Sequence, residues 1–179
     1  MRTATFFGGC VPASPQEEEL ARGIGRRLGQ AGFVLRHGGY NGLMEHAAQG
    51  AAATAAAVEA VTLAGADWGP FNPYVASAER APDMGARLAA FLDDTDLVIA
   101  MGGGVGTLHE LTAALWYAGN LRPVPVWIAG ATALCLLDFL QEQRWVYESP
   151  TRPLGFLRRV PDETVFETEL TTLLTGATR

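Results

Sequence analysis

A glycine-rich run with a threonine and a glutamate, residues 102–110, has the residue types and spacing to hold a phosphate beside a carboxylate. It follows an apolar segment and precedes an amphipathic stretch that reaches about Gly119. Glycines let the backbone approach a ligand closely, and a helix beginning near Thr107 would turn its free N–H groups toward the loop. The run therefore predicts an anion site, with Glu110 available to a reacting centre or to hydroxyl groups of the same ligand.

Two further glycine loops follow strand-like segments, at Gly8 and Gly9 and at residues 38–42. Ligands of parallel sheets bind at the carboxyl ends of the strands, where such loops lie. None of the three loops has the G-x-G-x-x-G pattern with an acidic residue about twenty residues further on. The loops therefore favour a phosphate-bearing ligand but do not support NAD binding.

Apolar segments alternate with amphipathic ones, which predicts an α/β fold: a doubly wound parallel sheet with helices on both faces. Strands are expected at residues 3–7, 33–36, 58–63, 97–100, 124–128 and 157–160. Helices are expected at residues 15–32, 43–56, 83–92, 107–119, 132–144 and 162–174. Residues 64–82 carry Trp68, Phe71 and Tyr74 among glycines and prolines, which predicts a long irregular loop of the kind that often has a function.

The composition limits the classes of protein and of partner. With 179 residues, 49% of them apolar, the chain is expected to form one globular domain over residues 1–179. A net charge of −6 argues against a nucleic-acid partner. No run approaches the roughly 18 apolar residues of a membrane span, and the apolar N-terminal run is short for a signal peptide. Two distant cysteines fit a reducing compartment, so a cytoplasmic location is expected.

All thirteen basic residues are arginines, and this absence of lysine excludes several kinds of chemistry. Schiff-base catalysis, including that of pyridoxal phosphate, needs a lysine amine, and a P-loop needs its lysine. The three histidines also lack ligand spacing with the two cysteines, so no metal site is expected. The predicted chemistry uses neither a metal nor a cofactor.

Four segments, in order, resemble motifs of the LOG family. Residues 37–45, HGGYNGLME, resemble the family's GGG-x-x-GLMG or GGY-x-GLME loop, and residues 103–110, GGVGTLHE, are similar to its PGG-x-GT-x-x-E. Residues 84–87, MGAR, stand where the family has M-x-x-RK, and residues 7–10, FGGC, resemble its CGS turn. The likeness spans roughly residues 3 to 130.

LOG proteins are Rossmann-like and often carry a lysine decarboxylase label, which the absence of lysine speaks against. Their characterised members are nucleoside 5′-monophosphate phosphoribohydrolases, such as those acting on cytokinin riboside 5′-monophosphates. The resemblance implies hydrolysis of an N-glycosidic bond to a free base and ribose 5-phosphate, and a homodimer formed through the helices after the glycine loops. It assigns catalysis to Arg87 and Glu110. The implied substrate- and phosphate-binding residues are Gly9, Gly38, Gly39, Gly42, Met84, Gly102, Gly103, Gly104, Gly106 and Thr107.

Three positions depart from the family pattern: Gly102 replaces its proline, Leu88 its lysine and His37 its third glycine. The first two replacements support an alternative, a non-enzymatic nucleotide- or cofactor-binding protein that acts as a sensor or carrier. A scaffold with an empty site is a third interpretation.

The two catalytic candidates also have purely structural interpretations. Thr107 and Glu110 have the T-x-x-E spacing of a capping box. In a capping box the two side chains accept hydrogen bonds from free N–H groups at the start of a helix and have no catalytic role. Arg87 follows Asp83 by four residues, the spacing of a surface ion pair on a helix. The sequence leaves both interpretations open beside the catalytic one.

Overall fold

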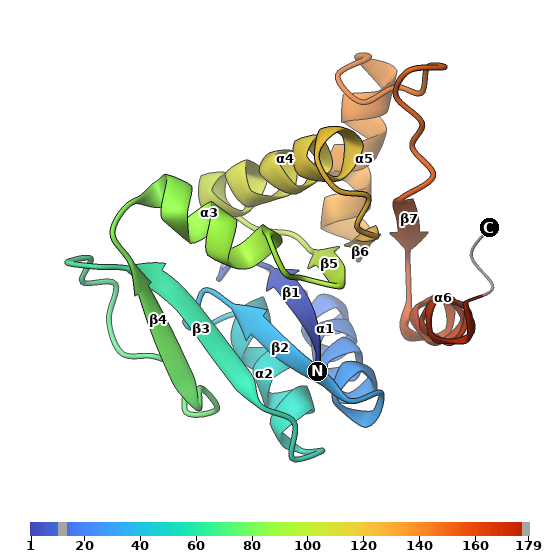
Figure 1. The fold of residues 1–179 in the computed structure, drawn as a ribbon. Helices are drawn as coiled ribbons and strands as arrows, with labels where there is room; N and C mark the ends of the chain where they lie inside the picture. The colour runs from blue at the N-terminus through green and yellow to red at the C-terminus, as the bar shows by residue number, and fades with distance from the viewer. Residues whose placement is uncertain (11–13, 177–179) are drawn as a thin grey trace.

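Seven parallel strands form one sheet in the computed structural model, which describes residues 1–10 and 14–176 (Figure 1). The strands are β1 (Arg2–Phe7), β2 (Phe33–His37), β3 (Val58–Leu63), β4 (Ser77–Ala81), β5 (Leu97–Ala100), β6 (Val126–Ala129) and β7 (Leu157–Val160). The helices are α1 (Pro15–Gln30), α2 (Leu43–Ala52), α3 (Met84–Leu92), α4 (Val105–Asn120), α5 (Ala131–Glu142) and α6 (Glu163–Thr175).

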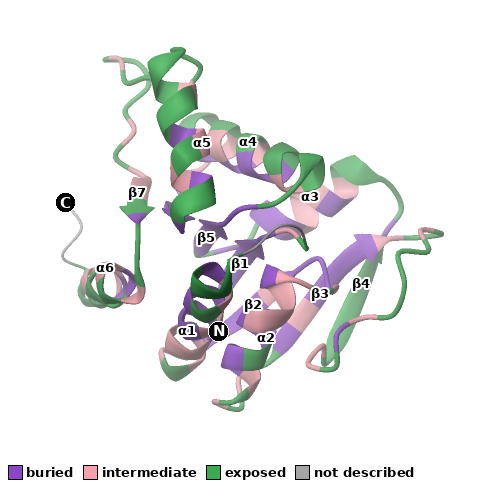
Figure 2. Cartoon of the chain, turned by 180° about the vertical axis from the view of Figure 1, so that it is seen from behind, coloured by how far each residue is buried: buried purple, intermediate pink, exposed green. Residues whose placement is uncertain are grey.

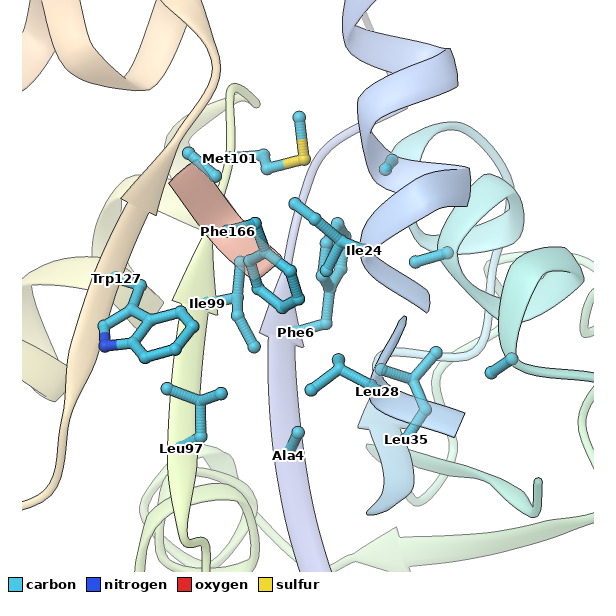
Figure 3. Close-up of a cluster of buried hydrophobic side chains, with 14 of the residues drawn as sticks. Ala4, Phe6, Ile24, Leu28, Leu35, Leu97, Ile99, Met101, Trp127 and Phe166 are labelled. Carbon is cyan, nitrogen blue, oxygen red and sulfur yellow. The ribbon is translucent and has the colours of Figure 1, made fainter. Parts of the chain in front are cut away.

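Helices cover both faces of the sheet, as predicted. Apolar side chains of α1, α2 and α6 pack on one face, and Figure 3 shows part of this core around Phe6, Ile99 and Trp127. Side chains of α3, α4 and α5 pack on the other face against Phe7, Val98 and their neighbours. Figure 2 shows the result: the central strands are buried and the outer helix faces are exposed. The predicted doubly wound α/β fold is confirmed.

The strand order β4-β3-β2-β1-β5-β6-β7 places β1 in the middle, paired with β2 on one side and β5 on the other. The chain builds outward from β1 to β4, then crosses over and builds outward again from β5. The point between β1 and β5 is the topological switch point, where doubly wound folds bind ligands. All three predicted glycine loops leave the carboxyl ends of β1, β2 and β5 and so meet there.

Helices α1 and α2 pack backbone against backbone, which two glycines permit. A Cβ on Gly25 would collide with the carbonyl of Ala47, and a Cβ on Gly50 would collide with the carbonyl of Arg22. The alanines of α2 keep this surface small. This close crossing holds α2 against the sheet, and the loop that leads into α2 belongs to the predicted site.

Several predicted boundaries differ from the structure by one or two residues or more, and three of these differences bear on the site or the fold. Residues 64–82 are not wholly irregular, because β4 lies within them; it is an edge strand with four of five residues exposed, so it lacks the apolar alternation that marks a strand. Helix α2 ends at Ala52 rather than near residue 56, because the chain turns there through Ala55 with φ at 61°. Helix α4 begins at Val105, two residues before the predicted start.

Candidate functional site

Gly9 joins the three glycine loops at the carboxyl edge of the sheet. Its N–H donates to the carbonyl of Gly102 at 2.9 Å, and its carbonyl accepts from the N–H of Leu43 at 3.0 Å. A Cβ on Gly9 would collide with Gly103, and one on Gly42 would collide with the backbone of Cys10. The structure thus brings the loops after β1, β2 and β5 into direct backbone contact, which only residues without side chains allow.

The helices differ in which groups accept hydrogen bonds from their first-turn amides. Three of them have N-cap side chains that accept a hydrogen bond from a first-turn amide: Ser14 for α1, Asp83 for α3 and Asp162 for α6. Helix α5 is capped by a side chain of α1 instead: Glu17 Oε1 accepts a hydrogen bond from the N–H of Thr132 at 2.9 Å. Helices α2 and α4 begin after Gly42 and Gly104 without a side-chain cap. Within the described chain, the uncapped starts are therefore those that follow glycine loops of the site.

The start of α4 faces open space. A Cβ on Gly104 or Gly106 would meet no heavy atom within 4 Å, and Val105 between them is 84% exposed. The Thr107 side chain lies against Gly103, where a Cβ would collide with its hydroxyl. Uncapped first-turn amides attract anions because they have unsatisfied hydrogens at the positive end of the helix dipole. This end of α4 has the geometry of a phosphate site.

Gly102, which replaces the proline of the LOG motif, packs against α5. A Cβ at this position would lie 2.8 Å from Cβ of Thr132, so the Thr132 side chain fills the space that a larger residue would need. Thr132 is itself held by Glu17, whose Oε2 accepts from the threonine hydroxyl at 3.0 Å. The loop at Gly102 is therefore supported by a neighbouring helix rather than by a proline ring.

Arg87 and Glu110 form a buried ion pair one helical turn beyond Thr107. Nη1 of Arg87 donates to Oε1 of Glu110 at 2.8 Å, and the residues are 7% and 9% exposed. Nε of Arg87 donates to the carbonyl of Val61 at 3.1 Å, and the guanidinium carbon lies 4.8 Å from the centre of the Phe91 ring. Helix α3 and strand β3 thus fix the arginine, which in turn fixes the carboxylate of α4.

Burial raises the pKa of the Glu110 carboxyl above its ordinary value, although the charge and hydrogen bond of Arg87 oppose this. A carboxylate that is poorly hydrated interacts strongly with any charge that develops beside it. The pair therefore presents a fixed acidic group close to the uncapped start of α4.

Both structural interpretations of the catalytic candidates are wrong. Thr107 is the third residue of α4 rather than its N-cap, so it cannot form a capping box with Glu110. Asp83 caps α3 through a hydrogen bond from the N–H of Ala86 at 2.9 Å and does not hold Arg87 on the surface. Instead, the two predicted catalytic residues contact each other.

The other predicted residues border the same edge. A Cβ on Gly38 would stand 3.2 Å from Nη2 of Arg87, so the second glycine loop lies beside the ion pair. Gly39 has φ at 95°, where a side chain would be strained, and its position is crowded by Phe71. Met84 is exposed at the first turn of α3, one turn before Arg87.

Sequence reasoning did not assign two residues that shape the site. Asn72, 7% exposed, donates from Nδ2 to the carbonyls of Gly39 and Tyr40 at 3.2 and 2.9 Å. Trp68 lies over the Arg87 guanidinium, whose carbon is 5.9 Å from the ring centre. The signal for Trp68 was its place in a glycine- and proline-rich loop, whereas no local pattern marks Asn72.

Two other kinds of feature are absent from the residues that the structure describes. No group of three or more histidine, cysteine, aspartate or glutamate side chains among them is placed to hold a metal ion. None of the described helices is long and apolar enough to cross a membrane.

Comparison with known proteins identifies the family of this chain. The model of the SLOG cluster4 family matches residues 2–124. An uncharacterized protein of Archaeoglobus fulgidus is 34% identical over 129 residues, which cover 68% of this chain and 83% of that protein.

Two solved structures share the fold. The molybdenum cofactor carrier protein of Chlamydomonas reinhardtii matches with a TM-score of 0.74 and 18% identity, over 97% of this chain and 98% of that one. The molybdenum cofactor binding protein of Rippkaea orientalis matches with a TM-score of 0.73 and 23% identity, over 97% of each chain. The family match spans all the predicted site residues, and the chain belongs to the SLOG cluster4 family, within the SLOG/LOG-like superfamily.

Proposed function

We propose that this protein hydrolyses the N-glycosidic bond of a nucleoside 5′-monophosphate, giving a free base and ribose 5-phosphate. One observation carries the proposal: the uncapped, open start of α4 lies one helical turn from the buried Glu110 carboxylate that Arg87 holds in place. A phosphate site and a carboxylate at this separation match the two ends of a ribose 5-phosphate unit.

The phosphate would accept hydrogen bonds from the amides of Gly103, Gly104 and Gly106 and from the Thr107 hydroxyl. Helix N-termini after glycine loops are common phosphate sites, because the free amides and the helix dipole both favour an anion. Gly104 and Gly106 leave the amides uncovered. The negative charge of Glu110 sits further along α4, partly neutralised by Arg87, which limits its repulsion of the phosphate.

Glu110 would act at the sugar. Breaking an N-glycosidic bond builds positive charge on the ribose ring, and a nearby carboxylate stabilises that oxocarbenium-like state or orients the attacking water. Arg87 would hold the carboxylate through Nη1. In the described part of the chain, its Nη2 makes no hydrogen bond and borders Gly38, so it can bind the substrate or steady the departing base.

The experiment that tests the phosphate site compares ligands with and without a phosphate by calorimetry. We expect nucleoside 5′-monophosphates to bind much more tightly than the matching nucleosides. Thr107→Val removes one hydrogen bond to a charged group and should weaken nucleotide binding about tenfold or more. Thr112→Val, on an exposed turn of the same helix, is the matched control and should leave binding unchanged. Equal affinities for nucleotides and nucleosides would contradict the site.

A second candidate is a non-enzymatic carrier of a nucleotide or cofactor. Its support is that nearly the whole chain shares its fold with a molybdenum cofactor carrier protein and a molybdenum cofactor binding protein. The replacement of the LOG lysine by Leu88 also favours it. A purified protein that binds a nucleotide tightly but releases no base from any nucleoside monophosphate would support the carrier over the hydrolase.

A further inference from the structure

Three aromatic side chains gather beside Arg87 at the carboxyl edge of the sheet. Tyr40, in the loop after β2, makes an edge-on contact with Trp68 at 5.8 Å and a tilted contact with Phe71 at 5.5 Å. Trp68 and Phe71 come from the loop between β3 and β4, which projects beyond the edge of the sheet (Figure 1). The guanidinium of Arg87 lies against the Trp68 ring.

The loop that carries Trp68 is anchored at its base. The N–H of Asn72 donates to the carbonyl of Gly39 at 2.8 Å, in addition to the two bonds from its side chain, and its Oδ1 accepts from the N–H of Tyr74 at 3.1 Å. The Tyr40 hydroxyl shares a 2.6 Å hydrogen bond with the Thr62 hydroxyl on β3. These contacts tie the Trp68 loop to the second glycine loop of the site.

Trp68 is nevertheless 53% exposed, although Tyr40 and Phe71 beside it are only partly exposed. Exposure of a large aromatic ring to water is unfavourable. Its contacts with Tyr40 and Arg87 fix the ring at the rim of the site. An anchored, half-exposed aromatic ring next to the Arg87–Glu110 pair suits a ligand that is itself flat.

We propose that Trp68 is the stacking surface for the heterocyclic base of the nucleotide and so determines which ligands bind. This inference rests on the proposed phosphate site. The α4 amides would hold the phosphate, Glu110 would face the ribose, and Arg87 links Glu110 to Trp68 through its contacts with both. The ligand would then lie across the carboxyl edge from α4 toward the loop between β3 and β4. Stacking tolerates any flat base, so Trp68 would favour nucleotides over sugar phosphates without choosing among bases.

A merely structural role for Trp68 makes a different prediction. The ring also covers Arg87, so its removal could weaken every ligand alike by exposing the ion pair to water. Such a variant would lose affinity for ribose 5-phosphate as much as for a nucleotide. The comparison of these two ligands therefore separates stacking from shielding.

The test is calorimetric binding of AMP and of ribose 5-phosphate to the parent protein and to Trp68→Ala, Trp68→Phe and Trp145→Ala. Trp145 is 77% exposed in the segment after α5 and is the matched control. We expect Trp68→Ala to weaken AMP binding about tenfold or more and to leave ribose 5-phosphate binding unchanged. Trp68→Phe, which keeps a flat ring, should recover part of the loss, and Trp145→Ala should change neither affinity.

Other outcomes overturn the inference in distinguishable ways. If Trp68→Ala loses affinity equally for both ligands, or for neither, Trp68 is not a stacking surface, and the phosphate site stands. If the parent protein binds AMP no more tightly than ribose 5-phosphate, the base contributes nothing to the affinity. The inference about Trp68 then fails, and the proposed function is unaffected. If the parent protein binds neither ligand, the proposed function fails and the inference fails with it.

Discussion

Arg87 and Glu110 are oppositely charged side chains that are both buried, and burial of a charged group is unfavourable. Taking two charges out of water costs several kcal/mol per ion, and their attraction and hydrogen bond offset that cost only when both are present. The pair is therefore poor at stabilising the fold compared with apolar side chains of similar size. We propose that its position beside the open start of α4 gives it a role in ligand binding and chemistry instead.

Arg87→Ala should lower the free energy of unfolding by about 3–5 kcal/mol, because it leaves Glu110 buried without a cation. A surface pair of Arg87 with Asp83 would cost at most about 0.5 kcal/mol. Chemical denaturation measures the difference, and Arg2→Ala, at an exposed position, should change stability by less than about 0.5 kcal/mol. A loss below about 1 kcal/mol for Arg87→Ala would contradict the buried pair described here.

His37 is a second buried polar residue, and it makes stability depend on pH. Complete burial lowers the pKa of its imidazole from 6.5 to about 4. Its Nδ1 accepts from the N–H of Gly39 at 2.7 Å, and its Nε2 has no partner among the described residues. The folded protein thus keeps the ring neutral, while the unfolded chain takes up a proton below about pH 6.5. Stability is lost as the pH falls from 6.5 toward 4.

His37→Asn tests this, because an asparagine oxygen can accept the same hydrogen bond from Gly39 but takes up no proton. Unfolding free energies at pH 7 and pH 4.5 should differ by about 2–3 kcal/mol more in the parent protein than in the variant. Acid-sensitive pairs such as Arg36 with Asp94 are present in both proteins and cancel. The same pH dependence in parent and variant would show that His37 is not held neutral.

At the residue scale, the sequence singled out side chains that the structure brings together, but it did not predict how they contact one another. The spacing of Thr107 and Glu110 fits both a capping box and an active site, and the choice depended on a helix boundary two residues away. The pairing of Arg87 with Glu110 joins α3 to α4, and no local pattern encodes a contact between residues so far apart in sequence. Asn72 was missed for the same reason, since its partners lie in another loop.

Among the elements, strands and helices with strong apolar periodicity were predicted to within a few residues. The strands at residues 58–63, 97–100 and 157–160 have the predicted limits. β4 was missed because it is exposed and polar, and only its hydrogen bonds to β3 make it a strand. The end of α2 was misjudged because alanine favours helix at every position, whereas the turn into β3 is imposed by the rest of the fold.

The close crossing of α1 and α2 makes an element-scale prediction. Gly50→Ala should lower the free energy of unfolding by about 1–3 kcal/mol, because the methyl group collides with the backbone of α1. Gly119→Ala on α4 is the matched control: its methyl group would lie 3.7 Å from the Phe156 ring, an ordinary contact. It should raise stability by up to about 0.5–1 kcal/mol through helix propensity. Thermal and chemical denaturation of both variants measure the contrast, and equal effects would contradict the tight crossing.

For the molecule as a whole, the sheet order explains why one edge holds all the predicted site residues. Reversal of the strand order between β1 and β5 separates the helices on the two faces and leaves the carboxyl ends open to a ligand. Alternation of strands and helices predicted the fold class and this edge. The strand order itself was not predicted, because pairing depends on contacts between distant segments.

Assembly is the prediction that belongs to the whole molecule. The homodimer is expected to form through the helices after the glycine loops, of which α4 is one. On α4, Leu111 is buried in the core, whereas Trp116 is 61% exposed. We expect a homodimer in which a second copy of the chain covers the exposed side of α4. Light scattering at micromolar concentration should give twice the 19.0 kDa chain mass, and Trp116→Glu should reduce it to one chain. A single 19.0 kDa species from the parent protein would contradict the dimer.

The most direct test of the central claim is the release of ribose 5-phosphate from nucleoside 5′-monophosphates by the parent protein and by Glu110→Gln. The account predicts turnover by the parent protein and a loss of about 10²–10³ in rate, roughly 3–4 kcal/mol, for the variant, with nucleotide affinity nearly intact. Glu142→Gln, at an exposed position on α5, should turn over as the parent does. Full activity in Glu110→Gln, or no ribose 5-phosphate from the parent with any nucleotide, would contradict the account.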